Sequence, residues 1–327
     1  MEKFRRLGWL LLRVAVSVGL LTLIIQRVPW RGIGQTLREA NPVWLLGAIL
    51  LAGVQVGFAS LRWQALLRAQ EIAFSLGETM RLTLIGHFFN AFLPGSTGGD
   101  LVRIYYAVRL VPKQKAAASL SVLYDRFVGV VVLLFIGSGL CFPLYPILSK
   151  SSLVLEVLLA FVLVALGIFL VALLAWLLPS LLRRRFFRLL ESHAPFHRLL
   201  EELSHALRRF AADPNATGRA ALFSFAAHGS TFGFAWFAAT ALQLPIPFWS
   251  LAGILAVVSV LDAIPISISG LGVREGLLVL FFQPLGLASA QAVTFSLLFF
   301  GTTLFWSFVG GIVYWKQKGK RSDEATP

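Results

Sequence analysis

Residues 94–103 read PGSTGGDLVR, and residues 265–274 read PISISGLGVR. Both stretches follow the pattern P-x-S-x-x-G-x-x-V-R, and each comes after a short apolar segment that carries a polar residue, Asn90 or Asp262. The identical positions are Pro94/Pro265, Ser96/Ser267, Gly99/Gly270, Val102/Val273 and Arg103/Arg274. Because the sequence context matches as well as the pattern, we interpret the two stretches as copies of one internal repeat.

The composition around these motifs is typical of a membrane protein. Of the 327 residues, 57% are hydrophobic and 13% are charged, whereas soluble domains have about 45–50% and about 25%. This composition excludes an ordinary soluble domain, a disordered chain and a collagen-like chain.

A spanning helix needs about 20 apolar residues. The apolar segments are 7–25, 42–61, 120–142, 153–179, 219–243 and 288–315, with shorter ones at 79–93, 246–264 and 273–284. None alternates like a strand, so we predict an all-α polytopic membrane helix bundle of about eight membrane segments.

Lysine and arginine residues gather at the ends of the apolar segments. The net charge of +14 is therefore interpreted as a signal of membrane orientation and not of nucleic-acid binding. This interpretation places both termini in the cytoplasm, although the basic loop 26–41 then lies outside. We expect one integral membrane domain over residues 1–327, with halves of about 1–150 and 151–315 and a short basic tail at 316–327.

Residues 183–215 form a basic segment inside the second half. Its apolar residues follow helical spacing, with charged residues between them, which predicts an amphipathic helix on the cytoplasmic side. Such a helix either lies on the membrane surface or packs over the cytoplasmic end of the bundle, and the sequence favours neither.

The number of preceding spans gives the two motifs opposite orientations. The first motif is entered from the cytoplasm after two spans, and the second is entered from outside after three more. Inverted repeats of this kind place broken helices and a substrate site near the middle of the bilayer. Pro94 and Pro265 end the incoming helices, and Gly95, Gly98 and Gly272 allow tight turns, so we expect two re-entrant hairpins.

Arg103 and Arg274 stand in the first turn of the helix that follows each motif. A helix N-terminus attracts anions, and arginine binds phosphate through two parallel hydrogen bonds. We therefore expect two anion-binding hairpins that face each other. The alternative is a pair of kinked helices whose arginines extend to the headgroup layer. The other residues expected to bind substrate are Asn90, Ser96, Gly99, Ser267 and Gly270.

Further ionisable residues lie in or beside the apolar segments. Asp125 and Arg126 are adjacent and face different sides of a helix, which predicts separate partners. Arg126 is either a third phosphate contact or an anchor at the membrane interface. Asp125, Asp262 and Glu275 are candidates for relaying charge or protons. The alternatives are a buried hydrogen-bonded role for Asp262 and a helix-capping role for Glu275.

The sequence contains no set of residues that predicts catalysis. There is no His/Asp/Glu cluster with metal-ligand spacing and no nucleophile motif of the G-x-S-x-G type. The lone cysteine, Cys141, forms no disulfide framework. We expect no metal, no cofactor and no enzymatic activity.

Three stretches resemble the lysylphosphatidylglycerol synthase transmembrane family, which is also described as flippase-like. They are residues 90–103 (NAFLPGSTGGDLVR), residues 124–126 (YDR) and residues 264–275 (IPISISGLGVRE). The resemblance implies about eight membrane helices with re-entrant segments in inverted repeats, and movement of lipids between leaflets. By the motif match it implies functional roles for Asn90, Pro94, Arg103, Arg126, Pro265, Gly270, Gly272 and Glu275.

The resemblance also suggests where this chain departs from its relatives. Only a short basic tail follows Tyr314, so we expect no aminoacyl-transferase domain, and a lysylated lipid is not a safe prediction of the substrate. We expect a transporter in a bacterial or archaeal cytoplasmic (inner) membrane that moves a lipid with an anionic, phosphate-bearing headgroup. The alternatives are a membrane transferase acting on a polyprenyl-phosphate or phospholipid, and a non-transporting partner of a separate lipid-modifying synthase.

Overall fold

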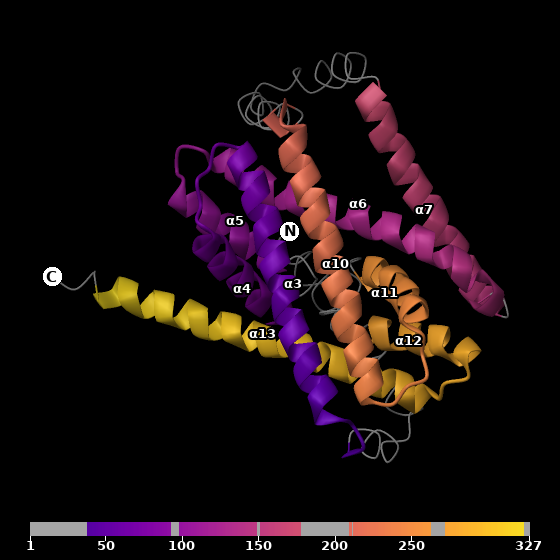
Figure 1. Ribbon diagram of the computed structural model, residues 1–327. Helices are drawn as coiled ribbons and strands as arrows, with labels where there is room; N and C mark the ends of the chain where they lie inside the picture. The colour runs from indigo at the N-terminus through magenta and orange to yellow at the C-terminus, as the bar shows by residue number, and fades with distance from the viewer. Residues whose placement is uncertain are drawn as a thin grey trace, which may run out of the picture.

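The computed structural model describes residues 38–92, 98–148, 151–177, 209–210, 212–262 and 272–323. Throughout these residues the secondary structure is helical, with no strand. The elements are α3 (Pro42–Ala69), α4 (Leu76–Phe92), α5 (Gly98–Leu110), α6 (Lys115–Leu148), α7 (Ser152–Leu177), α10 (Pro214–Ala241), α11 (Phe248–Asp262), α12 (Val273–Phe282), the 3₁₀ turn η2 (Gln283–Leu285) and α13 (Ser289–Asp323). Figure 1 shows their arrangement as a bundle.

Three helices within the described residues are long and apolar enough to cross a membrane: Pro42–Ala69, Lys115–Cys141 and Ser289–Gln317. Shorter apolar helices cover Ser152–Gly167 and Phe248–Asp262. The predicted fold class, a polytopic helical membrane protein, is confirmed. The expected first span at 7–25, nearly all of the amphipathic segment 183–215 and the turns of both motifs lie outside the described residues.

Helices α3 and α10 form the most extensive helix–helix contact among the described residues and run in opposite directions (Figure 1). The backbone N–H of Asn41, before α3, donates to the carbonyl of Ala241 at the end of α10 (2.9 Å). Small buried residues line both helices, including Ala48 and Ala52 on α3 and Ala235 and Ala238 on α10. Small side chains let helices approach closely, which is how helices associate in membranes.

The outer surface of α3 is apolar. Val43, Leu46, Leu50 and Val54 are all exposed, and their spacing places them along one side of the helix. Such a stripe is suited to contact with lipid acyl chains.

Helices α3 and α10 also share structural details that indicate a duplication. Each has 28 residues and begins with proline after a side-chain cap. Asn41 accepts the N–H of Val43 (2.9 Å), and Asp213 accepts the N–H of Ala216 (2.9 Å). Side-chain caps satisfy backbone donors that a helix start leaves unpaired.

The turns that leave these two helices match as well. Glu71 and Gln243, which stand 172 positions apart, both adopt positive φ, 59° and 55°. Directly after these residues, the backbone N–H of Ile72 donates to the carbonyl of Leu67, and the N–H of Leu244 donates to the carbonyl of Ala239. Because the two matching helices are antiparallel, this matching pair is related by inversion.

The helices that carry the motifs are exchanged between the halves. Helix α4 packs against α13, and α11 packs against α6, so the incoming helix of each motif contacts the long helix of the other half. Ser307 of α13 donates to the carbonyl of His87 on α4 (3.1 Å). A Cβ atom at Gly310 would clash with the backbone carbonyl of Leu84, so this crossing requires glycine.

Candidate functional site

The first motif closes into a helical hairpin made by α4 and α5. Asn90, near the end of α4, accepts the backbone N–H of Gly99 in the first turn of α5 (2.6 Å). A Cβ atom at Gly99 would overlap the carbonyl of Gly86, so glycine lets the two helices touch. The hairpin fixes the start of α5 and therefore the position of Arg103.

Arg103 is buried and bonded to two carboxylates. It donates to Asp100, one turn earlier on α5, and to Asp125 on α6, at 3.2 Å in both cases. Its guanidinium lies over the ring of Trp63 on α3, 4.2 Å from the ring centroid, which adds a cation–π attraction. The indole N–H of Trp63 donates to Ser121 (3.1 Å), which holds the ring in place.

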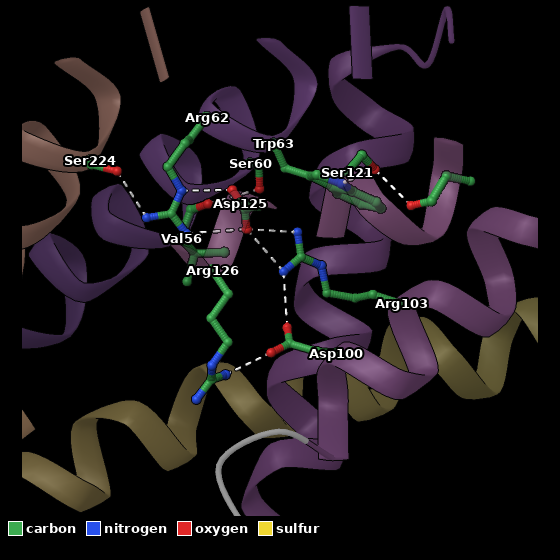
Figure 2. A network of polar contacts seen from close by, with 11 residues as sticks. Val56, Ser60, Arg62, Trp63, Asp100, Arg103, Ser121, Asp125, Arg126 and Ser224 are labelled. Carbon is green, nitrogen blue, oxygen red and sulfur yellow. Dashed lines mark hydrogen bonds and ion pairs between the residues drawn. The ribbon is translucent and has the colours of Figure 1, made fainter. Parts of the chain in front are cut away.

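Asp125 is shared by two arginines from different helices, as Figure 2 shows. Besides Arg103, it accepts two hydrogen bonds from Arg62 on α3, at 2.7 and 3.2 Å. Arg62 also donates to Ser224 on α10 (3.2 Å). Asp125 lies ten residues into α6, about 15 Å along the helix axis.

Arg126 points away from Asp125 and toward the start of α5. It donates to the second carboxylate oxygen of Asp100 (2.6 Å), and it is the most exposed arginine of the network. The adjacent residues Asp125 and Arg126 therefore bind different partners: Asp125 accepts from Arg62 and Arg103, and Arg126 donates to Asp100. Asp100 bridges Arg103 and Arg126 through its two oxygens (Figure 2).

A second network surrounds Arg274 at the start of α12. Arg274 donates to Ser296 on α13 (3.0 Å) and to Glu275 (3.1 Å), and its guanidinium lies 5.1 Å from the centroid of the Phe300 ring. Glu275 also accepts the hydroxyl of Ser296 and the backbone N–H of Gly272, both at 2.6 Å. Glu275 therefore caps α12 and balances Arg274 at the same time.

The predicted site residues fall into the first network, the second network and a remaining group that lies outside the described residues. The first network contains Arg103, Asp125 and Arg126, with Asn90, Gly98 and Gly99 in the adjoining hairpin. The second network contains Gly272, Arg274 and Glu275. Asp262 ends α11, and its buried Oδ1 atom has no hydrogen-bond partner among the residues that the structure describes. Pro94, Gly95, Ser96, Pro265, Ser267 and Gly270 lie outside the described residues.

The sequence did not reveal most of the partners of the two repeated arginines. The sequence predicted no site role for Arg62, Trp63 or Ser296. The repeat itself contains a signal for Ser296, because Asp125 follows Arg103 by 22 residues and Ser296 follows Arg274 by 22. Arg62 and Trp63 come from a separate helix and have no such signal.

Charged groups within membrane-spanning helices are costly unless they are paired. Both networks satisfy that requirement with carboxylates and hydroxyls, some on the same helix as the arginine and some on neighbouring helices. The described residues contain no group of three or more His, Cys, Asp or Glu that could hold a metal ion. Guanidinium groups held in this way are suited to binding anions.

Comparison with known proteins identifies the family. The model of the lysylphosphatidylglycerol synthase TM region matches residues 10–311. The chain belongs to this family. A UPF0104 membrane protein of Methanothermobacter thermautotrophicus is 25% identical over 279 residues, which cover 78% of this chain and 80% of that protein. As a family member with apolar helices, the chain is a multi-pass membrane protein.

Proposed function

We propose that this chain moves a lipid with a phosphate-bearing headgroup between the leaflets of the cytoplasmic membrane. The observation that carries the proposal is that Arg103, in the second turn of α5, and Arg274, at the start of α12, are both buried in the helix that follows a repeated Pro/Gly stretch. Transporters built from inverted repeats bind substrates between such helices. The family name, which refers to a lipid synthase, also supports a role connected with membrane lipids.

The proposed transport keeps the acyl chains in the bilayer throughout. Only the headgroup enters the bundle, where arginine side chains replace the water that it loses. Exposure of acyl chains to water, the most costly alternative, is avoided. We further propose that both termini are cytoplasmic, as the distribution of lysine and arginine favours.

A transport assay in liposomes tests this function. The purified protein is reconstituted with a trace of phosphatidylglycerol that carries a nitrobenzoxadiazole label, and the outer leaflet is bleached with dithionite. Transport is expected to bleach nearly all the label, whereas protein-free liposomes protect about half of it. An Arg103→Gln/Arg274→Gln variant is expected to protect the label as protein-free liposomes do. Protection of half the label by the wild type, with every phosphate lipid tried, would overturn the proposal.

The same liposomes distinguish the alternatives. Mass spectrometry of the extracted lipids would detect a headgroup change if the protein were a transferase. If transport appears only after a lipid-modifying synthase is added, the chain is the partner of that enzyme and not an independent transporter.

A further inference from the structure

We infer that a lipid docks sideways from the bilayer onto the outer face of α5 and α6, with its phosphate against Arg126 and its acyl chains over neighbouring apolar side chains. This inference rests on the proposed function and names the place where the substrate first contacts the protein. We call this surface the α5–α6 face and define it by Leu101, Tyr105, Leu123, Arg126 and Phe127.

Arg126 is the charged centre of the α5–α6 face. Its side chain is 32% exposed, whereas that of Arg103 is 9% exposed. Arg126 donates to Asp100 (2.6 Å), which fixes the side chain, and a guanidinium has five N–H donors in all. Arg126 is therefore the arginine of the first network that a ligand outside the bundle reaches first.

Exposed apolar side chains flank Arg126 on both helices. Leu123 and Phe127 stand one turn apart on α6, and their spacing places Arg126 on the same side of the helix. On α5, Leu101 and Tyr105 are also exposed and one turn apart. A phosphate-binding cation beside two rows of apolar side chains matches a phospholipid, whose headgroup carries acyl chains.

The second half of the chain shows that this position does not require a charge. Arg126 corresponds to Leu297, because the two residues directly follow Asp125 and Ser296, the matched partners of the repeated arginines. Leu297 is exposed as well, at 38%. A charge that faces the bilayer is costly, whereas a leucine is not. The arginine of the first half thus indicates an anionic partner, and its apolar surroundings indicate that the partner is a lipid.

The α5–α6 face is connected to the buried arginine of the first motif. Asp100 accepts from Arg126 with one carboxylate oxygen and from Arg103 with the other (Figure 2). A phosphate held by Arg126 therefore lies next to the ion pair that holds Arg103. The docking position is thus an entry point to the site proposed above.

Photo-crosslinking in liposomes tests the inference. The liposomes contain equal amounts of phosphatidylglycerol and of a galactosyl diacylglycerol with the same acyl chains but no phosphate. The photoreactive amino acid p-benzoylphenylalanine replaces Phe127 in one variant and Phe135 in another. Phe135 is the matched control, because it is an exposed phenylalanine farther along α6. After irradiation, mass spectrometry compares the two kinds of lipid adduct.

Phosphatidylglycerol adducts should be enriched at position 127 over position 135 by about three-fold or more. Arg126→Leu, which copies Leu297, should abolish that enrichment, whereas Arg126→Lys keeps the charge and should retain it. Arg68→Gln removes an exposed arginine in the last turn of α3. This control should leave the enrichment at position 127 unchanged.

Two results would overturn the inference. One is an equal ratio of the two adducts at positions 127 and 135, a comparison that needs no change at Arg126 and so holds even if Arg126→Leu does not fold. The other is an enrichment that persists in Arg126→Leu.

The inference and the proposed function fail in different ways. If labelled phospholipid is transported but position 127 shows no enrichment, the docking face is wrong and the transport proposal stands. If position 127 shows the enrichment but the wild type moves no lipid, the transport proposal fails, and the α5–α6 face remains a lipid-binding surface.

Discussion

Ser296 occupies in the second half of the chain the position that Asp125 occupies in the first. Each residue lies 22 positions after a buried arginine and accepts a hydrogen bond from it. The two positions correspond in the repeat, but only Asp125 carries a charge. In the second half the counter-ion is Glu275, which is bonded to Arg274 itself and to Ser296.

This difference predicts unequal costs of removing the two partners. In Asp125→Asn, Arg62 and Arg103 lose their shared counter-ion, and breaking a buried ion pair costs about 3–5 kcal/mol. In the control Ser296→Ala, Arg274 keeps Glu275, and the loss should be about 1 kcal/mol. Thermal unfolding in detergent, followed by tryptophan fluorescence, compares them. Equal losses would show that Asp125 is not the main counter-ion.

A double-mutant cycle tests the coupling of Arg274 and Glu275. The two side chains share an ion pair of 3.1 Å and a common partner in Ser296. We expect the free energies of unfolding of Arg274→Gln and Glu275→Gln to be non-additive by about 0.5–3 kcal/mol. A cycle of Glu275→Gln with the distant Arg109→Gln serves as control and should be additive. Additivity in both cycles would contradict the pairing.

Gly99 is predicted to be intolerant of any side chain. A methyl group there would meet the carbonyl of Gly86, and overpacking of this kind typically costs about 1–3 kcal/mol. We expect Gly99→Ala to lower the unfolding temperature and lipid transport together. Gly139→Ala is the matched control, because its added methyl group meets no atom within 4 Å. A Gly99→Ala protein as stable as the control would show that the hairpin tolerates separation of its helices.

Cysteine labelling tests the proposed orientation. In a Cys141→Ser background, single cysteines replace Lys113, in the turn before α6, or Pro245, in the turn before α11. These exposed turns lie at opposite ends of the antiparallel α3–α10 pair. A membrane-impermeant maleimide should label position 113 only from the cytoplasmic face and position 245 only from the other. Labelling of both positions from one face would refute the inverted arrangement, and reversed labelling would place the termini outside.

The fold was predictable to the extent that it depends on local sequence. Apolar length located α3, α4, α6, α7, α10, α11, α12 and α13, because a bilayer requires each spanning segment to satisfy its own backbone hydrogen bonds. The prediction did not include the exchange of α4 and α11 between halves. That exchange depends on close contacts such as Gly310 with Leu84, and sequence periodicity carries no information on which helix a glycine will meet.

The candidate site was predicted in outline. The duplicated motif located Arg103 and Arg274, and the adjacency of Asp125 and Arg126 predicted separate partners. The sequence did not indicate that Arg103 would be balanced by Asp125, or that Arg62 would share that carboxylate. Arg62 and Asp125 are 63 positions apart, and their ion pair forms only because α3 and α6 pack together.

The exchange of helices between the halves has a consequence for biosynthesis. The hydrogen bond between the carbonyl of His87 and the hydroxyl of Ser307 can form only after Ser307 is synthesised, 220 residues later along the chain. At ribosomal speeds of about 5–20 residues per second, that delay is about 10–40 s. During this interval α4 lies in the membrane without its final neighbour. Until α13 is inserted, the face of α4 that will contact it must therefore be covered by lipid or by the insertion machinery.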